Sequence, residues 1–63
     1  MWIISKDYAI NTDHLSWVGQ DSTKSGAVVG IRADGSETVI APSWDYEKIA
    51  QALKNNDNFV EVS

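Results

Sequence analysis

Residues 27–41 read AVVGIRADGSETVIA, and this stretch carries the clearest structural signal in the chain. Two runs rich in β-forming residues, 27–33 and 36–41, flank the dipeptide Asp34-Gly35. Asp-Gly between two such runs is typical of a two-residue hairpin turn, because both central residues of that turn must reach positive φ. The sequence therefore predicts an antiparallel β-hairpin over 27–41.

The length of this turn sets the expected register of the hairpin. It places Arg32 opposite Glu37 and Val29 opposite Ile40, so that the two apolar residues share the core face. The charged pair adds about 0.2–1 kcal/mol and helps to fix the register. Gly30 stands in the middle of its strand, where a glycine marks a bulge or a closely packed neighbour.

Short extended segments are predicted on the N-terminal side of the hairpin, at 2–4, 8–10 and 15–18. Turn-forming residues separate them, because Asp and Asn side chains bond their own backbone and favour turns. The polar stretch 19–26 reads GQDSTKSG and holds no large apolar side chain. It is predicted to be a loop, either a plain hairpin connection or a binding loop.

One amphipathic helix is predicted on the C-terminal side of the hairpin. Pro42 ends the second strand, and the Ser43 hydroxyl can cap the helix by accepting from an exposed amide. Apolar residues then recur at spacings of three and four, which places them on one face. They are Tyr46, Ile49, Ala50 and Leu53. The amide-rich run 55–58 ends the helix, and 59–62 reads as a further strand.

These elements predict a single small domain, 1–63, in the order β-β-β-β-β-α-β. We expect an α+β fold in which one helix packs on a curved antiparallel sheet of about four to six strands. A single helix cannot cover both faces of such a sheet. One face is therefore solvated, or the sheet curls, or a second copy covers it, so a homodimer is one expected assembly.

The composition limits the chemistry that the chain can perform. Its 63 residues include nine acids, five bases and no cysteine, for a net charge of −4. The absence of cysteine excludes a disulfide scaffold and a thiolate zinc site, and the small number of bases excludes a polybasic tail. Nucleic-acid binding is disfavoured because it needs a basic face. His14, the only histidine, lies in a turn-like stretch. We expect no enzyme activity, with no catalytic residue, no cofactor and no metal.

The three tryptophans and Tyr46 are the candidate interaction residues. Each indole has a large apolar body and one hydrogen-bond donor, so it either packs between sheet and helix or anchors an interface. Trp44 ranks first, because it lies at the start of the helix and precedes Tyr46. Trp17 follows, immediately before the polar loop, and Trp2 completes the set.

These observations predict a non-enzymatic protein-interaction module that binds a protein partner or a second copy of itself. No targeting signal and no membrane-length apolar run is visible, so we expect a cytoplasmic location without membrane binding. The alternative is an acidic inhibitor that occupies a basic groove of a nucleic-acid-processing host protein, since opposite charges attract such a partner.

The N-terminal quarter carries a loose pattern: Trp2-Ile3-Ile4-Ser5, then Ile10-Asn11, then Leu15 two residues before Trp17. In this pattern the chain resembles short β-rich proteins of unknown function from Gram-positive bacteria and their phages. The resemblance implies a small β-rich protein of bacterial or phage origin.

Residues 4–15 read ISKDYAINTDHL, and this string is similar to the closing segment of the LytTR DNA-binding domain, which reads I-S-K/R-S-Y-I-V-N-x-D-H-I. The similarity implies a second alternative, a LytTR-like DNA-binding fragment. Asp7 stands where that domain has a polar or basic DNA-facing residue, and the rest of the chain is acidic. We therefore interpret the similarity as coincidental strand–turn–strand chemistry, and we carry over no DNA-contact residue.

Overall fold

The computed structural model describes all 63 residues, and it confirms an α+β fold with the predicted order of strands and helix. The strands and the helix are β1 (Trp2–Ile4), β2 (Ala9–Asn11), β3 (Leu15–Asp21), β4 (Ala27–Arg32), β5 (Glu37–Ala41), α1 (Tyr46–Lys54) and β6 (Phe59–Glu61). Three short 3₁₀ turns lie between them: η1 (Thr12–His14), η2 (Ser22–Lys24) and η3 (Ser43–Asp45). No helix is long and apolar enough to cross a membrane.

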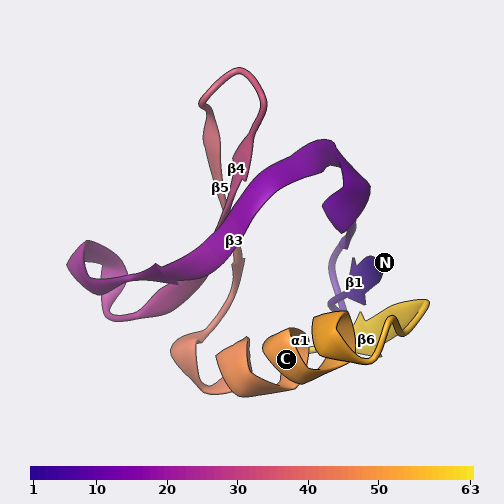
Figure 1. Ribbon diagram of the computed structural model, residues 1–63. Coiled ribbons are helices and arrows are strands. Elements are labelled where there is room, and N and C mark those ends of the chain that lie inside the picture. The colour runs from indigo at the N-terminus through magenta and orange to yellow at the C-terminus, as the bar shows by residue number, and fades with distance from the viewer.

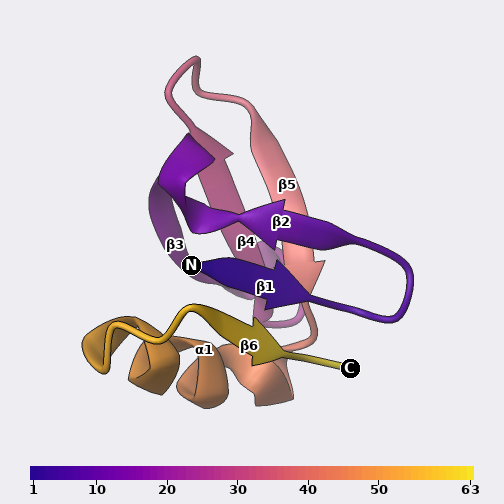
Figure 2. The same ribbon diagram turned by 90° about the vertical axis from the view of Figure 1, so that its right-hand side faces the viewer.

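The strands form two sheets of three strands each, so the predicted single sheet of four to six strands is wrong. One sheet has the order β2-β1-β6, which Figure 2 shows, and the other has the order β3-β4-β5 (Figure 1 and Figure 2). The sheets are separate because η1 turns the chain between β2 and β3. They are mostly antiparallel, but β6 follows the helix and returns parallel to β1, which the prediction also missed.

The hydrophobic core lies between the two sheets and α1. Figure 2 shows β2-β1-β6 in front of β3-β4-β5, with α1 along the bottom of both. Ile3, Ile40 and Ile49 are fully buried, and each comes from a different one of these three layers. Complete burial of one such side chain contributes about 1.5–3 kcal/mol, so these residues hold the layers together.

The β4–β5 hairpin is present, but the predicted register is wrong by one residue. Ile31, and not Arg32, pairs with Glu37, and Val29 pairs with Val39. Val39 is 50% exposed, on the outer face of the sheet. Val29 lies on this outer face too, away from the core cluster to which it was assigned.

A three-residue connection and a bulge explain the difference in register. The Gly35 N–H donates to the Arg32 carbonyl at 2.9 Å, and the Arg32 N–H donates to the Ser36 carbonyl at 2.9 Å. Gly35 takes a φ of +88°, as expected for a type I turn followed by a glycine bulge. A second bulge, opposite the bond between Val28 and Val29, lets Ile40 reach the core.

Two close approaches join β5 to the rest of the fold. A β-carbon at Gly30 would stand 2.7 Å from a Leu15 methyl and 2.9 Å from an Ile40 methyl, so Gly30 accommodates two core side chains. The Tyr8 hydroxyl donates a hydrogen bond to the Ile40 carbonyl. This bond connects the β1–β2 turn to β5 and therefore links the two sheets.

The helix begins later than predicted, and its buried face is rotated. Ser43 lies in η3 and not at the cap of α1, and Asp45 stands at the cap without a side-chain hydrogen bond to the helix. Ile49 and Ala52 are the buried helical residues, whereas Leu53 is 40% exposed. The loop predicted over 19–26 is also shorter, because β3 continues to Asp21.

Candidate protein-binding surface

Trp44 presents the most exposed of the large apolar side chains, at 74% exposure. Its indole Nε1–H donates to the Ser63 hydroxyl at 3.3 Å. The neighbouring Asp45 carboxylate, 6% exposed, accepts from the Ser63 backbone N–H at 3.1 Å. These two bonds hold η3 against the segment after β6. The ring is thus exposed to solvent but held in one orientation, which reduces the conformational entropy that is lost when a partner binds it.

A shallow hollow of about 370 Å³ lies beside Trp44. Tyr46 lines it together with Gln20, Ser43 and Glu47. Trp44 and Tyr46, two of the predicted interaction residues, therefore share one surface. Tyr46 is half-buried against the core, and polar groups surround the two aromatic rings, as at the rim of a protein interface.

Trp17 lies elsewhere, on the outer face of the sheet β3-β4-β5, where it pairs with Ile31 and is 48% exposed. Its ring covers the backbone of Gly19, where a β-carbon would stand 2.4 Å from two ring carbons. Val29 pairs with Gly19 and is 1% exposed on this same face. Val39, half exposed, extends this apolar surface onto β5.

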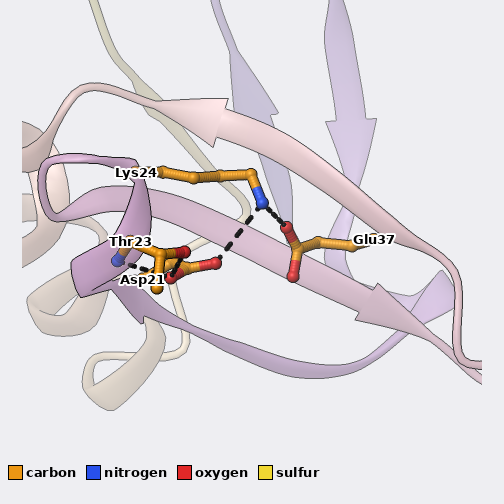
Figure 3. Close-up of polar contacts among 4 residues, drawn as sticks. All are labelled: Asp21, Thr23, Lys24 and Glu37. Atoms are coloured by element: carbon orange, nitrogen blue, oxygen red, sulfur yellow. Dashed lines mark hydrogen bonds and ion pairs between the residues drawn. The ribbon is translucent and has the colours of Figure 1, made fainter.

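A polar network crosses the same outer face and ties η2 to β5 (Figure 3). The Lys24 Nζ lies 2.6 Å from Glu37 Oε1 and 3.4 Å from Asp21 Oδ2. Thr23 donates to Asp21 Oδ1 from its hydroxyl at 2.6 Å and from its backbone N–H at 2.9 Å. This network was not predicted from the sequence, although an Asp followed two residues later by Thr is typical of such a local turn.

Hydrogen bonds in these turns shift three pKa values. Thr23, and secondarily Lys24, lower the pKa of the Asp21 carboxyl below 3.8. The bond to Glu37 raises the pKa of the Lys24 ammonium above 10.5. In the hairpin turn, Ser36 lowers the pKa of Asp34. Lys24 and Asp34 are exposed and Asp21 is partly exposed, so these shifts describe local order and not a reactive centre.

Trp2 occupies a third surface, the outer face of the sheet β2-β1-β6. It pairs with Phe59 on the parallel neighbour β6, and the two side chains are 48% and 55% exposed. Phe59 was not predicted to be an interaction residue. Strand alternation could have indicated it, because its neighbour Val60 faces the core and Phe59 must then face outward.

The structure therefore distributes the predicted interaction residues over three surfaces and joins only Trp44 with Tyr46. No group of three or more His, Cys, Asp or Glu residues lies close enough together to hold a metal ion. No protein-family model matches the chain, and no curated protein or solved structure is significantly similar to it. The two N-terminal resemblances thus stay predictions.

Proposed function

We propose that this chain is a non-enzymatic protein-interaction module of bacterial or phage origin, acting in the cytoplasm, which binds a partner protein through Trp44. The observation that carries the proposal is the 74% exposure of an indole that is held in place by a hydrogen bond to Ser63. Exposed apolar surface that polar residues surround is typical of a site that contacts another molecule. Tryptophan is also the residue type most enriched at binding hot spots.

The surroundings of Trp44 support the same proposal. Trp44 and Tyr46 form the apolar part of the hollow, and Gln20, Ser43 and Glu47 line it with hydrogen-bonding groups. An aromatic anchor surrounded by polar residues is the usual arrangement of an interface centre.

A second copy of the chain is a further proposed partner. The outer face with Trp17 and Val39 exposes apolar surface that self-association would cover. Sedimentation equilibrium over micromolar concentrations tests this form. A monomer at every concentration would eliminate the homodimer and leave the binding of a different protein.

The acidic inhibitor and the DNA-binding fragment receive less support. Asp21 and Glu37 are paired with Lys24, and Asp45 is buried, so these carboxylates are not free to meet a basic groove. A gel shift with duplex DNA at low salt tests direct DNA binding. The dependence of partner binding on salt tests the acidic inhibitor, because ionic contacts between exposed groups weaken as salt rises.

The main experiment is affinity capture from a bacterial lysate with the wild-type chain, Trp44→Ala and Ile4→Ala. Ile4 is the control, because it is a 38% exposed apolar residue on β1, away from Trp44. We expect one protein to be retained by wild type and Ile4→Ala through a high-salt wash. Loss of a hot-spot side chain costs at least about 2 kcal/mol, so Trp44→Ala should weaken its binding by more than tenfold.

Retention of the same partner by Trp44→Ala would contradict the proposal. Release of the partner from the wild-type chain by high salt would favour the acidic inhibitor instead. Turnover of a small metabolite by the purified chain would contradict a non-enzymatic role.

A further inference from the structure

A second hollow, of about 630 Å³, lies where β1 begins and where the connection from α1 reaches β6. Trp2 and Leu53 form apolar parts of its wall and are 48% and 40% exposed. The turn η1 and the connection 55–58 border it with polar side chains. Its volume lies within the range of about 300–1,000 Å³ that is usual for ligand pockets.

Every charged side chain that lines this hollow is acidic. Asp13 and Asp57 line it, and no Lys, Arg or His side chain does. The amino group of Met1 lies 3.7 Å from Asp13 Oδ1, so this carboxylate is already paired. Asp57 takes part in no ion pair. The hollow therefore has an unpaired carboxylate next to an exposed indole and an exposed leucine.

We infer that this hollow receives a lysine or arginine side chain of the partner protein. Such a side chain has an apolar stem and a cationic head group, and each part has a counterpart here. The stem can lie along Leu53, and the head group can contact the face of Trp2 and the Asp57 carboxylate. The net charge of −4 attracts the same kind of partner and repels an anionic ligand.

The inference rests on the proposed function for the source of the basic side chain, but its test needs no partner protein. The ¹⁵N-labelled full chain is titrated with N-acetyl-arginine amide, N-acetyl-lysine amide and N-acetyl-citrulline amide, and followed by NMR. Citrulline has the shape of arginine without its charge. We expect the two basic compounds to shift the Trp2 indole N–H and the backbone amides of 56–58, and citrulline to leave them in place.

Two variants locate the binding. Asp57→Asn should weaken the affinity for the arginine compound by about threefold to fivefold, the size of an exposed ion pair. Asp7→Asn is the matched control, since it removes the same charge from the exposed β1–β2 turn, outside the hollow, and it should change the affinity by less than about 1.5-fold at physiological salt. Trp2→Leu should weaken the affinity by about twofold to fivefold through loss of the cation–π contact.

Equal shifts with citrulline would overturn the inference, as would equal weakening by Asp7→Asn, which would indicate bulk charge alone. Absence of shifts with both basic compounds would overturn it as well. If Asp57→Asn loses the spectrum of a folded chain, Asp57→Ser serves as the second carboxylate variant, with the same expected weakening. Failure of the Trp44 capture experiment would leave this titration unchanged, so the two proposals fail separately.

Discussion

The ring of Trp17 covers Gly19, two residues farther along β3, and a β-carbon at that glycine would stand 2.4 Å from two ring carbons. Val29, which pairs with Gly19 on the adjacent strand, is 1% exposed although it faces outward. The ring lies over the place that a side chain at Gly19 would occupy. A glycine is needed at position 19 because any side chain there would collide with the Trp17 ring.

Gly19→Ala should displace the Trp17 ring and lower the free energy of unfolding by about 1–3 kcal/mol, as for other overpacked sites. Acrylamide quenching of Trp17 should rise, measured in a chain whose other tryptophans are replaced by phenylalanine. Gly30→Ala is the control, because its β-carbon would meet Leu15 and Ile40 on the core side. It should also destabilise the fold, but without increased quenching. Unchanged quenching in Gly19→Ala would contradict this packing.

Tyr8→Phe should lower the free energy of unfolding, because the Tyr8 hydroxyl is the donor to the Ile40 carbonyl that links the two sheets. Loss of one such bond costs about 0.5–1.5 kcal/mol. Urea unfolding measures the change. Tyr46→Phe is the matched control, since it removes a tyrosine hydroxyl that does not join the sheets, and it should have little effect. Equal changes for the two variants would rule out the linking role of Tyr8.

The hairpin was predictable from the sequence, and its register was not. Asp34-Gly35 indicates a turn, but the same dipeptide serves both a two-residue turn and a three-residue connection in which only the glycine has positive φ. The structure uses the second form, with Gly35 at +88°. One residue of difference moved Val29 from the predicted core face to the outer face. Turn chemistry alone could not distinguish these alternatives.

The division into two sheets was not predictable from local patterns either. Strands β1, β2 and β6 have three residues each, so no long alternation shows which strand each one joins. The helix was recognised from its apolar spacing, but Leu53 was assigned to the core because β6 and the 55–58 connection could not be placed. For the candidate site, the exposure of Trp44 matches its selection, while Phe59 and the Lys24 network were missed.

The two helical residues Ile49 and Leu53 give a direct test of the buried face of α1. Ile49 is fully buried and Leu53 is 40% exposed. Ile49→Ala should reduce the free energy of unfolding by about 2–5 kcal/mol, since it leaves a cavity in the core. Leu53→Ala should reduce it by less than about 1.5 kcal/mol, because much of that side chain already meets water. Thermal unfolding measures both, and equal losses would contradict the orientation of the helix.

The polar network predicts how stability depends on pH. The folded-state pKa of Asp21 is below 3.8, so its contribution is present above that pH and is lost as pH falls through the folded value. The raised pKa of Lys24 acts in the opposite direction, with a contribution present below pH 10.5 and lost as pH rises through the folded value.

Asp21→Asn should therefore lower Tm at neutral pH, and its difference from wild type should shrink as pH falls below 3.8. Thermal unfolding between acidic and neutral pH checks this sign. Asp7→Asn is the control, because Asp7 forms no ion pair. A difference between Asp21→Asn and wild type that grows toward low pH would contradict the assigned contacts.

The central claim is that the Trp44 side chain becomes buried in the interface with the partner protein. The direct measurement is acrylamide quenching of Trp44 fluorescence in a chain in which Trp2 and Trp17 are replaced by phenylalanine. The chain is measured alone and with the captured partner, and the partner is prepared without tryptophan. In the free chain the 74% exposed indole should be quenched efficiently. We predict that the partner lowers this quenching several-fold. Quenching that stays unchanged at saturating partner would contradict the claim.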